Sequence, residues 1–243
     1  MATYINQPTI ATNFLAPERA SFDVKGSALD GGRNGLGDSI AIETTGGGIV
    51  TATYEDCKIK DKEQYEYINW LGARLNGSFR FINVEIPTDW FGPFPTIGGL
   101  PTPIVSGIPH SDGSTFDDGS GYSQATVWGR ATQFAALNAG VINIQVSGMV
   151  RRLRHSDWFS IYHPTKGWRA YRYWDVLDAP SSGNNGTYRL AISPPLREAV
   201  TTDTRIEFAR PRFVAKFPSE FTLPSVLEAF FVTKQTIQFS EAF

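Results

Sequence analysis

Only one stretch of this chain has the apolar spacing of an amphipathic helix, and this scarcity constrains the fold more than any other feature. In DKEQYEYINWLGARLNG (61–77), apolar side chains recur at steps of three and four residues: Tyr65, Ile68, Leu71 and Leu75. Asp61 followed by Gln64 resembles a capping box, and Gly77 stands where helices commonly end. We therefore predict a helix over 61–76 and expect most other regular structure to be β.

Short runs of β-forming residues, separated by turn signals, precede and follow this helix. RASFDV (19–24) predicts a first strand, and LDGGRNGLG (29–37) predicts a glycine-rich loop. Residues 38–59 predict a hairpin that turns at Gly46-Gly47-Gly48, where positive φ costs little. SFRFINVEI (78–86) predicts a strand directly after the helix. These features together predict a sheet with one helix laid across it.

The second half of the chain has the strand spacing of a small barrel or sandwich. We predict a hairpin over 157–177 that turns at HPTKG. We also predict single strands at 139–148, 187–196, 204–209 and 212–217. A last strand within 230–243 would close the first domain if it pairs with the N-terminal strand. The predicted fold is mainly β, of the α+β class. It consists of a β-sandwich domain (1–86 and 218–243), a Pro/Gly-rich loop (87–124) and an inserted small β-barrel (125–217).

The segment HSDGSTFDDGSGY (110–122) is crowded with oxygen ligands but lacks the spacing of a calcium site. Counted from Asp112, Phe116 and Ser123 occupy positions where an EF-hand needs ligands. Asx-turns, in which a short side chain bonds its own backbone, account for the Asp-Gly pairs. We therefore interpret this segment as a connecting loop and predict no metal.

No pattern in the sequence predicts catalysis or a bound cofactor. A G-x-S-x-G elbow is absent, and Cys57 lies within a predicted strand, where a buried apolar role is commoner. The three histidines, His110, His155 and His163, have no spacing that supports a catalytic set. We predict that the chain is not an enzyme.

The ends and the charge of the chain indicate a soluble protein that meets copies of itself. The N-terminus lacks a secretory pattern, and no apolar run approaches the ~18 residues that span a bilayer. We expect synthesis in a cytoplasm and no membrane insertion. Residues 1–125 carry 8 basic and 15 acidic side chains, whereas residues 126–243 carry 14 and 9. Such opposite charge fits either an ordinary solvated surface or head-to-tail contact between identical chains, in which the acidic part of one copy meets the basic part of the next.

Two groups of side chains are candidates for contact with a partner chain. The first is aromatic and lies in the open Pro/Gly loop: Trp90, Phe91 and Phe94. These residues could instead cover the core of their own domain. The second group is basic and opens an Arg- and aromatic-rich segment: Arg151, Arg152 and Arg154. A composition of this kind is typical of proteins that bind single-stranded nucleic acid. The chain's pI of about 5.9, however, is lower than that of a typical nucleic-acid-binding domain.

Several segments resemble tail proteins of long-tailed bacteriophages and related prophages. They are PHSDGSTFDDGSGYSQ, DWFSIYHPTKGWRAYRYWDV and YRLAISPPLREAVTTDTRIEFARPRFVAKF, together with the hairpin–helix–strand order and the final FSEAF. The resemblance implies a distal tail protein, with a tail-tube-like β-sandwich and helix that forms hexameric rings under the tail tube. Insertions in that family project outwards. It brings no catalytic residues.

On this resemblance we expect a structural virion protein of the tail, assembled in the host cytoplasm. Its partners would be copies of itself, the tail tube protein and the tail hub or tip proteins, with DNA only in transit. The hairpin 38–59 would extend an inner wall, on which Glu43, Glu55 and Asp56 would repel the phosphate backbone. The alternative is a carbohydrate-binding receptor module with Trp90, Trp158 and Trp168 as sugar platforms.

Overall fold

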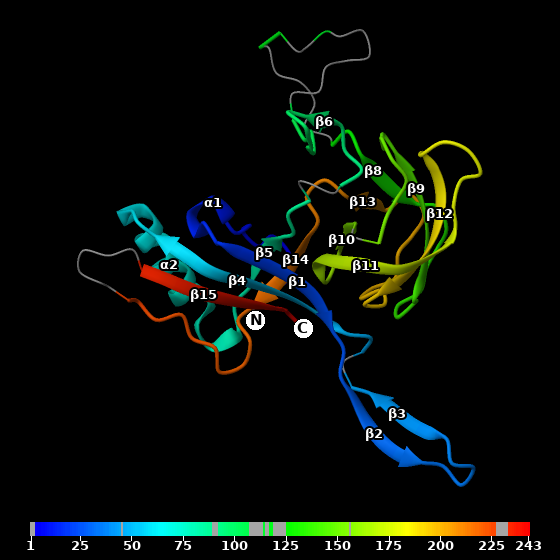
Figure 1. Ribbon diagram of the computed structural model, residues 1–243, viewed down its shortest axis with the longest axis horizontal. Helices are drawn as coiled ribbons and strands as arrows, with labels where there is room; N and C mark the ends of the chain where they lie inside the picture. Colours follow the sequence, from blue (N-terminus) through cyan, green and yellow to red (C-terminus); the bar gives the residue numbers. More distant parts are fainter. Residues whose placement is uncertain are drawn as a thin grey trace. The chain divides into compact units, whose positions relative to one another are not determined.

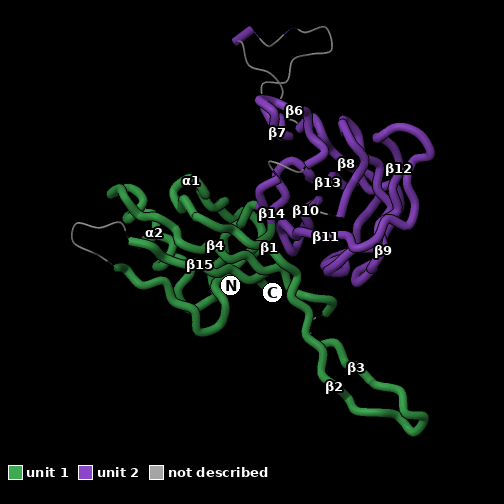
Figure 2. Tube along the Cα trace, in the orientation of Figure 1, with its two compact units in different colours: residues 1–85, 213–243 green, residues 86–212 purple. Residues whose placement is uncertain are grey.

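The computed structural model describes residues 3–44, 46–88, 92–106, 114, 117–118, 125–155, 157–226 and 233–243. Its chain is mainly β and divides into two compact units (Figure 2). Unit 1 comprises Met1–Glu85 and Phe213–Phe243, and unit 2 comprises Ile86–Arg212. The first domain was predicted to resume at residue 218. The structure resumes it at 213, because the strand there joins the sheet of unit 1 and not the barrel.

Unit 1 is built on a five-stranded sheet (Figure 1). In spatial order its strands are β1 (Arg19–Lys25), β4 (Ile49–Ile59), β15 (Thr233–Glu241), β14 (Arg212–Lys216) and β5 (Ile82–Glu85). The last strand was expected beside the first. Instead β15 pairs with β4 and β14, so β4 separates it from β1. With eleven residues of alternating burial, β4 is long enough to hold a partner along each edge.

Helix α2 (Lys62–Leu75) confirms the predicted helix. The Gln64 side chain accepts a hydrogen bond from the Asp61 N–H at 3.3 Å, which closes the capping box. Ile68, Leu71 and Leu75 are buried. A 3₁₀ turn (Asn76–Ser78) with Gly77 at φ 75° follows, so the next strand begins at Ile82 and not at residue 78 as predicted. A short helix α1 (Thr12–Leu15) precedes β1.

The segment predicted as a loop and a hairpin is arranged differently. β2 (Ala28–Arg33) and β3 (Ser39–Glu43) pair with each other as a separate two-stranded sheet. Residues 38–59 are therefore not one hairpin, and residues 29–37 are not only a loop. Gly46, Gly47 and Gly48 all have positive φ, and they lead the chain out of β3 and into β4 without folding one strand on the other. We call residues 28–43 the arm.

Unit 2 contains a closed six-stranded barrel, in agreement with the predicted small barrel. Its strands are β8 (Trp128–Ala131), β9 (Val141–Ser147), β10 (Trp158–His163), β11 (Gly167–Asp178), β12 (Gly186–Ser193) and β13 (Arg205–Glu207). β13 pairs with both β8 and β10, which closes the ring of strands. Alternate residues such as Ile142, Ile144 and Val146 fill the interior. A small hairpin of β6 (Thr96–Ile97) and β7 (Leu100–Pro101) precedes the barrel.

Candidate functional site

The arm has one apolar face and one polar face, and both are exposed. Leu29 is the cross-strand partner of Ile42, and Ile40 lies two residues before Ile42, so the three side chains share a face. The exposed fractions of Leu29, Ile40 and Ile42 are 61%, 43% and 54%. The other face presents Asp30 and Glu43 with their small partners, Ala41 and Ala28. An amphipathic sheet with a bare apolar face is built for contact with another surface.

The tip of the arm is a rigid turn that presents one leucine. The Asn34 carboxamide oxygen accepts hydrogen bonds from the N–H groups of Leu36 and Asp38, both at 2.9 Å. Its nitrogen donates to the Asp38 carboxylate at 3.0 Å. These bonds fix the turn and leave Leu36 with 89% of its surface exposed. The turn therefore holds a large apolar side chain in solvent, where it contributes little to the stability of its own subunit.

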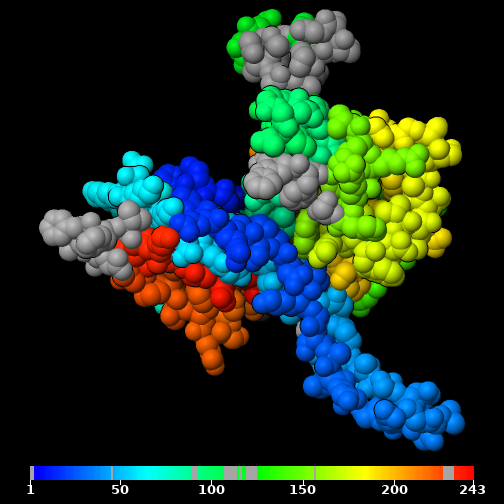
Figure 3. All heavy atoms as spheres, in the orientation of Figure 1, coloured from blue at the N-terminus to red at the C-terminus, as the bar shows by residue number. Residues whose placement is uncertain are grey.

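The arm gains no cover from its own unit. All eleven residues of β2 and β3 are exposed, and in Figure 3 the arm stands clear of the rest of unit 1. A hairpin of two strands is at best marginally stable in water without a further strand or a packed face. Among the described strands, the neighbouring β1 lies at the edge of its sheet and pairs with β4 alone. Its outer edge carries backbone groups suited to pairing with another chain.

The three predicted lining residues lie on two separate elements. Glu43 ends β3 and accepts a hydrogen bond from the Gly47 N–H at 2.7 Å. Glu55 lies on β4, 3.4 Å from the Arg19 guanidinium of β1. Asp56 has a φ of 51° and stands at an irregularity of the β4–β15 ladder. All three reach solvent, but the single hairpin that was expected to carry them does not exist.

The polar face of the five-stranded sheet carries charges of both signs. Glu18 lies between two lysines, 2.8 Å from Lys58 and 2.9 Å from Lys234. Hydrogen bonds from these ammonium groups lower the pKa of Glu18 to about 2. Together with the Arg19–Glu55 pair, this makes the face electrostatically mixed.

Of the three aromatic partner candidates, Trp90 and Phe91 lie outside the described residues. Phe94 has only 1% of its surface exposed and belongs to the hydrophobic core of unit 2. It is therefore unavailable to a partner chain, and for this residue the prediction is wrong. The reading in which it covers its own core is the correct one, because the strand-poor segment around it packs onto the barrel.

The arginine candidates also serve the barrel itself. The Arg151 guanidinium donates two hydrogen bonds to the buried carboxylate of Asp157, at 2.6 Å and 2.9 Å. The backbone N–H of Arg154 donates to the same carboxylate at 2.8 Å. The Tyr173 hydroxyl donates to the Arg154 carbonyl. Arg152 donates to the carbonyls of Gly183 at 3.0 Å and Pro180 at 2.9 Å. Arg151 and Arg152 therefore anchor their own loops, although Arg152, like Arg154, remains exposed.

Neither described tryptophan that was predicted as a sugar platform offers a bare ring. Trp158 is 7% exposed. The Arg212 guanidinium lies 4.7 Å above the Trp168 ring, and Tyr162 packs edge-on against it at 5.3 Å. The Asp-rich segment 110–122 lies outside the described residues except for Ser114, Asp117 and Asp118.

Two titratable side chains of the described residues, His163 and Cys57, are buried. Burial lowers the pKa of His163 to about 4, and its Nε2 lies 2.8 Å from the Tyr171 hydroxyl. Burial raises the pKa of Cys57 to about 11, which keeps the thiol protonated. The described residues contain no group of His, Cys, Asp or Glu side chains that could hold a metal ion. In the same part of the chain, no helix is long and apolar enough to cross a bilayer.

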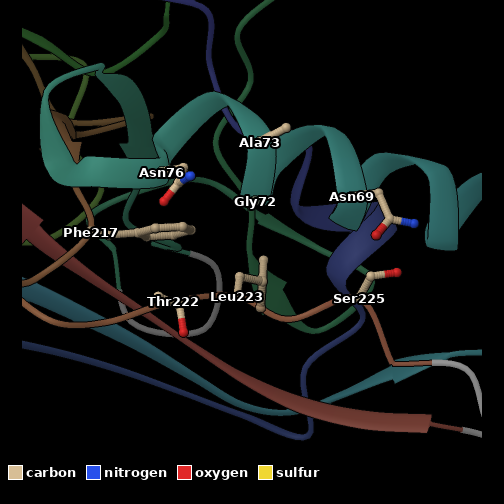
Figure 4. A pocket seen from close by; sticks show the side chains of 8 residues that line it. All are labelled: Asn69, Gly72, Ala73, Asn76, Phe217, Thr222, Leu223 and Ser225. Atoms are coloured by element: carbon tan, nitrogen blue, oxygen red, sulfur yellow. The ribbon is translucent and has the colours of Figure 1, made fainter.

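A shallow groove of about 400 Å³ lies between helix α2 and the segment that follows β14 (Figure 4). The Tyr65 hydroxyl lies 2.7 Å from the Ser225 hydroxyl, and a Cβ on Gly72 would meet the Leu223 carbonyl at 3.0 Å. Gly72 thus lets this segment pack closely on the helix. The lining is uncharged: Asn69, Gly72, Ala73, Asn76, Phe217, Thr222, Leu223 and Ser225. We interpret the groove as a packing seam of unit 1.

Comparison with known proteins gives no match that bears on these surfaces. No protein-family model matches the chain, and no curated protein matches it either. On geometry, the candidate site is the arm, with its exposed apolar face, together with the outer edge of β1. Sequence reasoning placed SIAIE (39–43) in a strand but paired that strand with the run after Gly48, and it missed the true partner strand because the glycines of LDGGRNGLG indicated a loop.

Proposed function

We propose that the chain is a structural subunit of a closed homo-oligomeric ring, and that its arm joins neighbouring subunits. The observation that carries the proposal is the exposed apolar face of Leu29, Ile40 and Ile42. Burial of such side chains against another chain contributes about 1.5–3 kcal/mol each. A second copy is the occupant that we favour, because every copy offers both an arm and an open β1 edge.

An arm on one side and its receiving surface elsewhere on the subunit make a heterologous contact. Contacts of this type generate a ring when the rotation between copies closes. The charge asymmetry supports the same arrangement, since residues 1–125 have a net charge of −7 and residues 126–243 a net charge of +5. The arm itself carries Asp30, Asp38 and Glu43 against the single cation Arg33.

We further propose that this ring is hexameric and lies at the distal end of a bacteriophage tail. It would connect the tail tube to the hub and tip proteins and let DNA pass through its centre. The support is the resemblance of the sequence segments, the mainly β fold with one long helix, and the arm. The polar face of the arm, with Asp30 and Glu43, is the part of the molecule that best suits an acidic passage.

The test is the mass of the purified full-length protein by native mass spectrometry, with negative-stain images of the particles. We expect wild type to form rings with a central opening. Ile42→Asp places a charge on the apolar face and should leave monomers. Ser39→Asp places the same charge on the polar face, opposite Arg33, and should leave the rings intact.

Two results would contradict the proposal. One is a wild-type protein that stays monomeric at high concentration and shows no rings when it is mixed with a tail tube protein. The other is equal behaviour of Ile42→Asp and Ser39→Asp, because the contact would then not involve the apolar face of the arm.

A further inference from the structure

A groove of about 460 Å³ runs along the outer wall of the barrel in unit 2, beside β8 and β13 (neighbours in Figure 1). It is lined by Trp128, Gly129, Arg130, Asp203 and Arg205. Its volume falls in the range of about 300–1,000 Å³ typical of small-molecule sites. Because Trp128, Arg130 and Arg205 alternate with the inward-facing Gly129 and Ile206, their side chains all stand on the outer face.

The polar groups of this groove are held in place before any ligand arrives. Arg130 donates from Nε and Nη2 to the side-chain oxygen Oε1 of Gln145 at 3.0 Å and 2.9 Å, and from Nη1 to the Asp203 carboxylate at 3.3 Å. The turn that carries Asp203 is tied to β8, since the Asp203 N–H donates to the Ala131 carbonyl at 2.9 Å. The guanidinium keeps further N–H donors beyond these bonds.

The groove is balanced in charge. Arg205 is the cross-strand partner of Arg130 and lies 3.6 Å from the Glu207 carboxylate. Glu207 in turn accepts hydrogen bonds from the N–H groups of Ala209 and Arg210, at 2.9 Å and 3.2 Å. The lining therefore carries two arginines and one carboxylate, Asp203, and the Glu207 carboxylate that pairs with Arg205 is buried beside it. Such a surface offers fixed donors and acceptors without the excess positive charge that a phosphate backbone requires.

Trp128 supplies the apolar part of the groove. It is half-buried on β8, between its cross-strand partners Ser147 and Glu207. A half-buried indole that lines a groove together with Arg and Asp side chains suits one chemical class of ligand. A pyranose presents C–H groups on one face, which pack on an aromatic ring, and adjacent hydroxyls around its edge, which bond guanidinium and carboxylate groups in pairs.

We propose that this groove binds a neutral saccharide. The site differs from the tryptophans that the sequence suggested, since it uses Trp128 in place of Trp158 and Trp168. The proposal does not depend on the ring, because every lining residue belongs to unit 2 of one chain. A single-stranded oligonucleotide is the competing ligand, and the balanced charge disfavours it.

The test is binding of the full-length protein to a glycan array that contains neutral, sialylated, sulfated and phosphorylated oligosaccharides, together with a thymidine oligonucleotide. We expect binding to neutral oligosaccharides. Titration calorimetry with the strongest neutral binder should then show that Trp128→Ala and Arg205→Ala each weaken binding at least about tenfold, a loss of about 1.4 kcal/mol. Trp128→Phe should retain a large part of the affinity.

Trp174→Ala is the matched control. Trp174 lies on β11, is 66% exposed and takes no part in the groove, so its removal should leave binding unchanged. Each variant must keep the wild-type thermal unfolding curve, which we expect because the changed side chains reach solvent. The proposal is overturned if wild type binds no neutral glycan, if only anionic glycans or the oligonucleotide bind, or if Trp128→Ala binds as wild type does.

Discussion

The barrel and the arm are both antiparallel β structure, yet the barrel has no unpaired strand edges and the arm leaves its edges unpaired. Closure of six strands gives each barrel strand two neighbours, and its apolar side chains fill one interior. The arm has two strands, two open edges and an apolar face in solvent. The barrel thus buries its apolar side chains within one chain, whereas the arm leaves its own exposed, which is why we propose that another chain covers them. Function that depends on assembly is therefore expected at the arm.

The largest effect is expected where the barrel relies on its own ion pair. Arg151→Ala leaves the buried Asp157 carboxylate without its cation, which costs about 3–5 kcal/mol of unfolding free energy. Arg154→Ala removes an exposed guanidinium from the same loop and should cost less than about 0.5 kcal/mol. Denaturant unfolding followed by tryptophan fluorescence measures both, since five of the six tryptophans lie in residues 86–212. Equal losses would show that Asp157 does not need Arg151.

A pair of isoleucines compares the two regions directly. Ile144→Ala empties space in the barrel core, where the side chain is fully buried, and should cost about 2–5 kcal/mol. Ile42→Ala in the arm should change the unfolding free energy of the isolated subunit by less than about 0.5 kcal/mol. The measurement is denaturant unfolding at concentrations where the protein is monomeric. A large loss for Ile42→Ala would mean that the arm packs within its own chain.

Substitution of one glycine in the barrel and one in the arm compares how tightly the backbone is packed in the two regions. A Cβ on Gly148, whose φ is 79°, would lie 1.8 Å from the Thr126 carbonyl oxygen, so Gly148→Ala should destabilise the barrel by at least about 2 kcal/mol. Gly35, in the turn of the arm, has nothing within 4 Å of such a Cβ. Thermal unfolding of Gly35→Ala should match wild type. A matching loss at Gly35 would indicate that the turn is packed.

The smallest effect is a dependence of barrel stability on pH. His163 has a folded-state pKa of about 4, below the 6.5 of an ordinary histidine, so the unfolded chain binds the proton more tightly. Its contribution is present above pH 6.5 and is lost as the pH falls toward 4, with a loss of about 2 kcal/mol between about pH 7 and pH 5. His163→Gln should remove this slope in denaturant unfolding. His155→Gln, at an exposed histidine of the same unit, should keep it.

The elements that followed from the sequence are those with strong local signals. The helix has its capping pair and apolar stripe, and the β10–β11 hairpin has alternation around a Pro/Gly turn, so both were predicted within a few residues. The arm was missed because glycines in Asp30-Gly31-Gly32 suggested a loop, although a strand without a core can accept them. Phe94 was assigned to a partner because an aromatic residue in a Pro/Gly loop gives no sign of what it packs against.

By itself, the sequence determined the mainly β class, the one long helix and the presence of a small barrel, since these depend on periodicity and turn residues close together in the chain. Only the tertiary structure decided which strands are neighbours, that β15 lies beside β4, and that Arg130, Asp203 and Arg205 meet beside Trp128. These contacts join residues far apart in sequence, and local patterns do not record them. The same reason explains the arm, because exposure is a property of the folded surface and not of any short segment.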